Sequence, residues 1–232
     1  MDRPKQVSGE HDGTGHRARL RDRLLSAGAE ALAPHEIVEY LLALTIPRRD
    51  TKPLAKALLT EFGSIGALVS ATPDSLLRVP GMGETSAAAF KIVQAACLRL
   101  LRDDISERPI LGSWPALLDY LRADLGHLAV EHIRVLHLNA RNVLIRDELI
   151  SEGSVDQSAI YVREVIKRAL DIGSTAIILV HNHPSGDTQP SRQDISVTRD
   201  IVEAGKRLGI AVHDHIIIAS GGHSSMRSMG LL

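Results

Sequence analysis

The chain has 232 residues, of which 44% are hydrophobic and 24% charged, and its formal net charge is −1. These values are typical of a globular protein with one large or two small domains, and they exclude a strongly basic nucleic-acid-binding protein. No apolar run approaches the roughly 20 residues of a membrane-spanning helix, and the N-terminus lacks the apolar core of a signal peptide. The single cysteine, Cys97, lies in an apolar helical run that predicts a buried thiol. Because one cysteine cannot form an internal disulfide, we expect a cytoplasmic protein.

The N-terminal part of the chain is predicted to be helical after a short disordered start. Residues 1–15 are polar and Gly-rich, which predicts disorder. A helical domain is expected over 16–104. Its first helices are predicted at 17–25, from Pro34 onward, and at 51–62, where Gly28 and Gly63 follow the first and third of them.

The segment 72–87 predicts a short helix, a Gly-rich turn and a long helix from about Glu84 to Leu101. It resembles a helix-hairpin-helix element, which in many DNA-binding proteins contacts the phosphate backbone. Gly81 and Gly83, after Pro80, permit positive φ and close approach of the backbone. The following helix presents free N–H groups to an anion. We therefore expect DNA as a candidate partner of the hairpin at Pro80, Gly81 and Gly83.

An alternative role for this region is structural, or docking of another protein. Between Arg17 and Arg102 there are 12 Lys and Arg against 8 Asp and Glu, so the excess of positive charge is only four. Glu84 beside the hairpin would also repel a phosphate. Contact with DNA here would not distinguish one base sequence from another.

Residues 105–112 are predicted to form a linker, and 113–232 a second domain that begins with a helix capped by Ser113. Strands and helices are mixed along this domain, which predicts an α/β fold with a central sheet flanked by helices. Strands are expected at 131–138, 143–150, 175–183 and 210–220, and helices at 114–125, 161–170 and 191–208. A turn is predicted at 139–142, and Gly173 is expected to end the middle helix.

Two histidines end the most apolar of these strands. His181 and His183 follow the run 176–180 and, being two residues apart, point to the same face of the strand. A turn rich in Pro, Gly and Asp comes next, and Asp194 falls in the first turn of the following helix. Two imidazoles and one carboxylate leave the fourth position of a tetrahedral zinc site open for water, as in catalytic zinc sites.

Each part of this pattern has a plainer explanation. Ser191 and Asp194 have the spacing of a capping box, which satisfies the free N–H groups of a helix start. His181 and His183 alone would fit a polar patch on a strand. The combined spacing His-x-His-x7-Ser-x2-Asp after a buried strand favours a metal site.

This spacing resembles the JAMM motif of JAB/MPN metalloprotease domains, and the stretch His-Asn-His-Pro-Ser-Gly-Asp resembles the RadC family in particular. Further stretches similar to that family lie at 131–136, 161–164, 213–217 and 230–232. The resemblance covers nearly all of the chain after the first dozen residues. It implies one zinc ion held by His181, His183 and Asp194, a catalytic glutamate at position 131, and a serine, Ser191, that stabilises an oxyanion.

The expected chemistry is hydrolysis of an amide by a metal-activated water. Zinc lowers the pKa of bound water to about 7, and Glu131 would take its proton and pass it to the leaving amine. Glu148 and Glu152 are alternatives to Glu131. His213 and His215 share a strand face, where they would bind a second metal or, more in keeping with their position, orient a zinc ligand from behind.

Three functions remain open from the sequence. The first is a zinc-dependent metallopeptidase or isopeptidase whose peptide or isopeptide substrate the sequence does not name. The second, to which the family name points, is a DNA-binding repair or recombination factor whose zinc domain is a scaffold or acts on phosphodiesters. The third is an inactive interaction module stabilised by zinc. The complete ligand set and Glu131 favour the first, and no membrane partner is expected.

Overall fold

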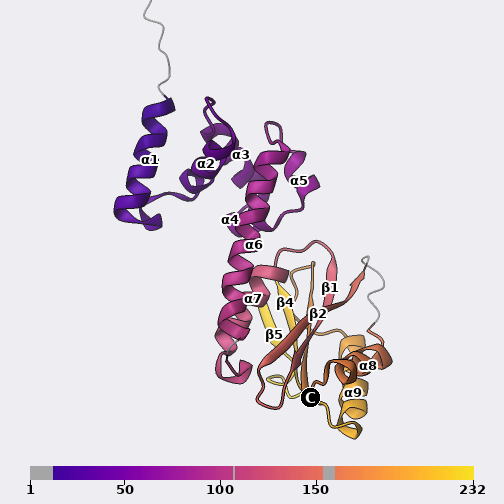
Figure 1. Ribbon diagram of the computed structural model, residues 1–232. Coiled ribbons are helices and arrows are strands. Elements are labelled where there is room, and N and C mark those ends of the chain that lie inside the picture. Colours follow the sequence, from indigo (N-terminus) through magenta and orange to yellow (C-terminus); the bar gives the residue numbers. More distant parts are fainter. Residues whose placement is uncertain (1–12, 107, 154–159) are drawn as a thin grey trace, which may run out of the picture. The chain divides into compact units, whose positions relative to one another are not determined.

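The computed structural model describes residues 13–106, 108–153 and 160–232. The chain divides into two compact units, residues 1–93 and 94–232, and the division falls within one long helix (Figure 1). No helix in the described residues is both long enough and apolar enough to cross a membrane.

In the first unit, the residues that the structure describes form helices and no strand. They are α1 (Gly13–Ala27), α2 (Pro34–Thr45), α3 (Lys52–Phe62), α4 (Ile65–Ser70), α5 (Pro73–Leu77) and the first part of α6 (Glu84–Ser106), with a 3-10 turn at Ala29–Ala31. Helices α4 and α5 are capped by the side chains of Ser64 and Thr72, which accept from the backbone N–H groups of Ala67 and Ser75. The apolar faces meet in a core that includes Leu42, Leu58 and Phe90.

The helices predicted at 17–25, from Pro34 and at 51–62 are confirmed, as is the short-helix, turn and long-helix arrangement of 72–87. The six-residue helix α4 was not predicted. The predicted disorder of residues 1–15 lies mostly outside the described residues, and α1 already begins at Gly13.

Two predictions near the end of α6 are wrong. Residues 105–112 are not a free linker, because α6 continues to Ser106 and both Ile105 and Ile110 are fully buried in the core of the second unit. The charged residues between these two isoleucines in the sequence led to the prediction of an exposed linker. Cys97 is exposed rather than buried, since Leu98, Leu101 and Ile105 form the face of α6 that packs on that core.

The second unit is built on a five-stranded sheet with the order β2-β1-β3-β4-β5. Its strands are β1 (Glu131–Leu138), β2 (Leu144–Gly153), β3 (Ala176–Asn182), β4 (Ala211–Ala219) and β5 (Gly222–Ser225). Only β3 and β4 run parallel, and the other neighbours are antiparallel. Helices α7 (Trp114–Leu125), α8 (Val162–Ile172) and α9 (Arg192–Arg207) pack on the sheet, together with the end of α6. The mixed α/β prediction for this part of the chain is therefore confirmed.

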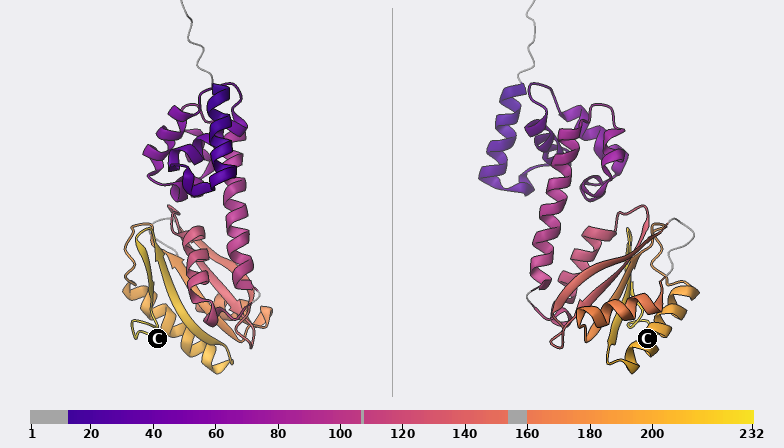
Figure 2. Two further views of the ribbon diagram at one scale, coloured as in Figure 1. Left: turned by 90° about the vertical axis from the view of Figure 1, so that its left-hand side faces the viewer. Right: turned by 45° about the vertical axis from the view of Figure 1, so that its right-hand side comes forward.

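The sheet is covered on both faces because its central strands alternate between two cores. Ile178 and Val180 of β3 pack with α7 on one face, and Ile177 and Leu179 pack with α8 and α9 on the other. The views in Figure 2 show α7 on one side of the sheet and the pair α8 and α9 on the opposite side. Burial on both faces explains why β3 is apolar at every position before its histidines.

Ser113 does precede α7, as predicted, but its side chain does not cap the helix: its hydroxyl donates to the carbonyl of Pro109. Gly173 ends α8 in the left-handed conformation, as predicted. The turn after β1 is also confirmed, with Asn142 at a φ of 58° and its N–H donating to the carbonyl of Asn139.

A buried charge network joins α7 to the first two strands. The Asp147 carboxylate, whose side chain is 0% exposed, accepts from the Tyr120 hydroxyl at 2.6 Å and from Arg134 Nε at 2.8 Å. Arg134 also donates to Asp124 at the end of α7. This network holds β1, which begins with the candidate catalytic residue Glu131, against α7.

We predict that Asp147→Ala destabilises the protein by about 3–5 kcal/mol, because Arg134 and Tyr120 lose a buried partner. The measurement is chemical denaturation followed by circular dichroism. Asp119→Ala, at an exposed position of α7, is the matched control and should change the stability by less than about 0.5 kcal/mol. Equal effects of the two substitutions would contradict the role given to Asp147.

Candidate metal centre

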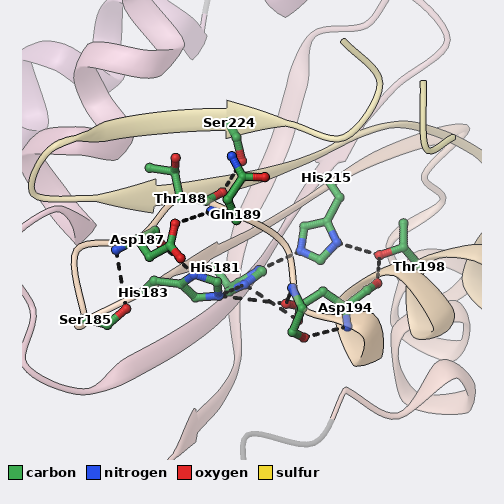
Figure 3. Close-up of polar contacts among 11 residues, drawn as sticks. His181, His183, Ser185, Asp187, Thr188, Gln189, Asp194, Thr198, His215 and Ser224 are labelled. Atoms are coloured by element: carbon green, nitrogen blue, oxygen red, sulfur yellow. Dashed lines mark hydrogen bonds and ion pairs between the residues drawn. The ribbon is translucent and has the colours of Figure 1, made fainter. Parts of the chain in front are cut away.

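Two imidazoles and one carboxylate converge where β3 ends and α9 begins (Figure 3). Nε2 of His181 lies 2.8 Å from Nε2 of His183. The Asp194 carboxylate approaches these two atoms with oxygens at 3.7 and 3.8 Å. The sequence predicted these three residues as metal ligands, and the structure brings them together. Within the described part of the chain, they are the one group of three or more His, Cys, Asp or Glu side chains arranged to hold an ion.

Local structure explains why the three side chains meet. His181 and His183 share a strand face, and the β3 backbone is prolonged past Asn182 by a hydrogen bond from the N–H of His183 to the carbonyl of Ile218. Asp194 is fixed by a capping box: its Oδ2 accepts the N–H of Ser191 at 2.8 Å, and its own N–H donates to Ser191 Oγ at 3.1 Å. The cap aims the carboxylate at the strand. Asp194 is therefore shared by the helix cap and the candidate metal group, and neither role excludes the other.

The hydrogen bonds of His183 test whether these residues fit a cation. Nδ1 of His183 lies 2.7 Å from the backbone carbonyl of Asp187, which can only accept, so Nδ1 carries the proton. In a neutral imidazole, Nε2 is then an acceptor. This acceptor faces the anionic carboxylate of Asp194 at 3.8 Å, too far for a hydrogen bond. Ligand atoms that are each about 2.0–2.2 Å from one zinc ion lie up to about 4 Å apart, so the arrangement fits a metal.

The side chains of His183 and Asp194 are 18% and 14% exposed, whereas that of His181 is 1% exposed. One side of the group is therefore open to solvent and the other is closed by the protein. An ion held here by three protein ligands would keep a position that water or a substrate can reach, as metal sites that take part in catalysis do.

Glu131 lies on the same face of the sheet as the two histidines. It begins β1 two residues before Ile133, and Ile133 pairs with His181 across the antiparallel strands. Burial raises the pKa of the Glu131 carboxyl and the negative charge of Asp194 raises it further, while His183 lowers it. A carboxylate with a raised pKa beside a candidate metal position is suited to accept a proton.

The two alternatives to Glu131 are placed differently. Glu148 forms a bidentate pair with Arg168, which lowers the pKa of the Glu148 carboxyl. Glu152 is 61% exposed at its side chain and lies beside His132, 3.6 Å from its Nε2. The charges of Asp194 and His183, by contrast, both act on the pKa of the Glu131 carboxyl.

Two residues of the site were not predicted from the sequence. Asn182, between the histidines, is 1% exposed; its Oδ1 accepts the N–H of His132 at 2.8 Å and its Nδ2 donates to the carbonyl of Val130 at 3.0 Å. It thus binds the backbone on both sides of Glu131. Thr198, one turn after Asp194, contacts His215 at 2.6 Å. An amide inside an otherwise apolar strand was a signal for Asn182, but its partners are about 50 residues away.

His213 and His215 separate in the structure. His215 is 0% exposed and its Nε2 lies 2.8 Å from Nδ1 of His181, whereas His213 contacts the side chain of Asn142. One of the two histidines was expected to orient a metal ligand, and in the structure His215 is the one that contacts the candidate ligand His181. The described residues do not assemble a second metal group around His213.

Comparison with known proteins gives the family. Residues 111–231 match the family model of the RadC-like JAB domain, and residues 14–88 match that of the UPF0758 N-terminal domain. The chain belongs to the RadC-like JAB family. It is also 47% identical over 213 residues to a UPF0758 protein of Rhodobacter capsulatus, covering 92% of this chain and 100% of that one. The RadC-like JAB match contains β1, β3 and α9, and so includes all three candidate ligands and Glu131.

The buried histidines predict an acid-sensitive metal-free protein. Burial lowers the pKa of His181 to about 4, against the attraction of Asp194, and lowers the pKa of His215 well below its usual value. In the unfolded chain, a histidine has a pKa of about 6.5. As the pH falls from about 6.5 towards 4, the unfolded chain binds protons that the folded chain does not. Each of these histidines then lowers the free energy of unfolding by up to about 1.4 kcal/mol per pH unit.

This prediction is checked by urea denaturation of the metal-free protein between pH 7.5 and pH 4.5. His215→Gln removes one of the two groups and should make the dependence less steep, whatever its effect at neutral pH. An unchanged slope in this variant would show that His215 is not kept neutral by the fold.

Proposed function

We propose that the protein is a zinc-dependent metallopeptidase of the isopeptidase type, in which a metal-activated water attacks an amide. The observation on which the proposal rests is the convergence of His181, His183 and Asp194 beside Glu131 on one face of the sheet. The RadC-like JAB domain belongs to a superfamily that includes metalloenzymes, and this agrees with a catalytic use of the site. The substrate class that suits these groups is a peptide or an isopeptide.

His181, His183 and Asp194 would hold the metal through two imidazole nitrogens and one carboxylate oxygen. Nitrogen and oxygen ligands in this combination suit zinc. When bound, zinc polarises a carbonyl oxygen and lowers the pKa of water to about 7, which provides a nucleophile at neutral pH.

Glu131 is the proposed general base and general acid. Its raised pKa makes its carboxylate a better acceptor for a proton from the attacking water, and the same proton can then pass to the leaving amine. Asn182 supports this role, because its amide holds the residues on either side of Glu131 in place. A general base must stay within hydrogen-bonding reach of the reacting water, so an anchored strand start favours catalysis.

Ser191 is the proposed donor to the oxyanion. In the cap, Ser191 Oγ accepts the N–H of Asp194, and this contact does not use the hydroxyl proton. The proton is therefore available to a developing negative charge on the substrate. Loss of one such donor in a protease lowers the rate by about 10²–10³-fold.

We predict that Glu131→Gln lowers peptide or isopeptide cleavage by about 10²–10⁴-fold while the zinc content stays at that of the wild type, because general acid–base catalysis is lost and no ligand is removed. The measurement combines cleavage of peptide and isopeptide libraries with metal analysis of the same samples.

Glu152→Gln is the matched control, since Glu152 is an exposed glutamate of the neighbouring strand. It should retain activity. Cleavage that survives in Glu131→Gln at the wild-type rate would remove Glu131 from the mechanism.

The second candidate function is DNA binding by the first unit, in a repair or recombination role. The feature that favours it is the hairpin between α5 and α6, where Gly81 has a φ of +96° and α6 begins directly after Gly83. A helix start of this kind presents N–H groups that suit a phosphate. On this proposal, the first unit binds the nucleic acid backbone without reading its sequence.

Gly83 allows a direct test of this second function. A Cβ atom added at Gly83 would meet no atom within 4 Å, and Gly83→Asp and Gly83→Asn then place side chains of similar size at the hairpin. We predict that DNA affinity falls with rising salt and that Gly83→Asp weakens it by about tenfold more than Gly83→Asn, since only the aspartate repels phosphate. Fluorescence anisotropy with duplex DNA measures both effects. Equal affinity of the two variants, or binding unaffected by salt, would argue against phosphate contact at this hairpin.

A further inference from the structure

A chain of three hydrogen-bonding groups lies behind His181 (Figure 3). Nδ1 of His181 is 2.8 Å from Nε2 of His215, and Nδ1 of His215 is 2.6 Å from the hydroxyl of Thr198. The Thr198 hydroxyl in turn contacts the backbone carbonyl of Asp194. His215 and Thr198 are both 0% exposed, so solvent does not compete for these contacts.

The direction of every bond in this chain follows from its last member. A carbonyl oxygen can only accept, so the single proton of the Thr198 hydroxyl is donated to Asp194. The Thr198 oxygen must then accept the proton on Nδ1 of His215. A neutral His215 protonated at Nδ1 has an acceptor at Nε2, and this atom must receive the proton on Nδ1 of His181. The remaining nitrogen of His181, Nε2, is left with a lone pair that faces the candidate metal position.

We propose that Thr198 and His215 are positioning residues that hold His181 in the tautomer protonated at Nδ1, so that its Nε2 is always ready to bind metal. The hydrogen-bond relay stands on its own geometry, and its purpose rests on the proposed function. His183 reaches the same tautomer independently, through the carbonyl of Asp187. Because Asp194 and Thr198 lie one turn apart on α9, this helix supplies one ligand and controls the protonation of another.

The relay matters because the other tautomer of His181 would close the site. With its proton on Nε2, His181 would donate to Nε2 of His183, only 2.8 Å away. That hydrogen bond would occupy both ligating nitrogens of the metal-free protein and would have to break before an ion could enter. The hydroxyl of Thr198 removes this competitor by fixing the proton on the far side of the ring.

The experiment compares Thr198→Val, which has nearly the same shape but no hydroxyl, with Thr198→Ser, which keeps the hydroxyl. In the metal-free full-length protein, ¹⁵N NMR of the imidazole nitrogens reports which atom of His181 carries the proton. Competition with a chromophoric chelator measures zinc affinity. Thr60→Val is the matched control, because Thr60 makes the same hydroxyl-to-carbonyl bond, to Lys56 in α3, but is not part of the relay.

We expect wild type, Thr198→Ser and Thr60→Val to show His181 protonated at Nδ1 and to bind zinc equally well. Thr198→Val should populate the Nε2–H form of His181 and bind zinc about 10–100-fold more weakly, as is usual when a group that orients a ligand is lost. Wild-type His181 protonated at Nε2, or a Thr198→Val variant with the wild-type tautomer and affinity, would overturn the proposal. A protein that shows the predicted tautomers but cleaves no peptide would keep the relay and reject the proposed function.

Discussion

The site depends on hydrogen-bond acceptors that face one another without enough donor protons between them to pair them. Nε2 of His183 is an acceptor because Nδ1 of the same ring donates to a carbonyl, and the carboxylate of Asp194 faces it across 3.8 Å. Such groups repel unless something positive lies between them. The fold nevertheless holds these groups in place through hydrogen bonds that belong to a strand pairing, a turn and a helix cap. A cation is the simplest partner that satisfies all of them at once.

The rest of the second unit can be understood as the support for this convergence. Pairing of β1 with β3 places Glu131 on the histidine face, and the Asn182 amide anchors the start of β1. The buried network of Asp147 fastens β1 to α7 on the opposite face. The Asp147 network and the three candidate ligands thus lie on opposite faces of the sheet, so either group can be altered without directly touching the other.

Much of this was predictable because it depends on short-range patterns. The apolar run before His181 and the spacing of His181 and His183 predicted a buried strand with both rings on one face, and Ser191 with Asp194 predicted a helix start. Other features depend on partners far away in the chain. The roles of Asn182 and Thr198 follow from contacts with β1 and β4, and Ile105 and Ile110 are buried by a sheet that comes later in the sequence. Apart from the amide of Asn182 in an otherwise apolar strand, no local pattern distinguishes these residues from ordinary strand, helix or linker positions.

The central claim is that His181, His183 and Asp194 bind one ion together, and metal analysis combined with X-ray absorption spectroscopy of the purified full-length protein tests it most directly. The account predicts one zinc per chain, with nearest-neighbour scattering from two imidazole nitrogens and from oxygen atoms at about 2.0–2.2 Å, and loss of the metal in Asp194→Ala. A wild-type protein that takes up no metal when zinc is supplied, or one whose zinc remains fully bound in Asp194→Ala, would contradict it.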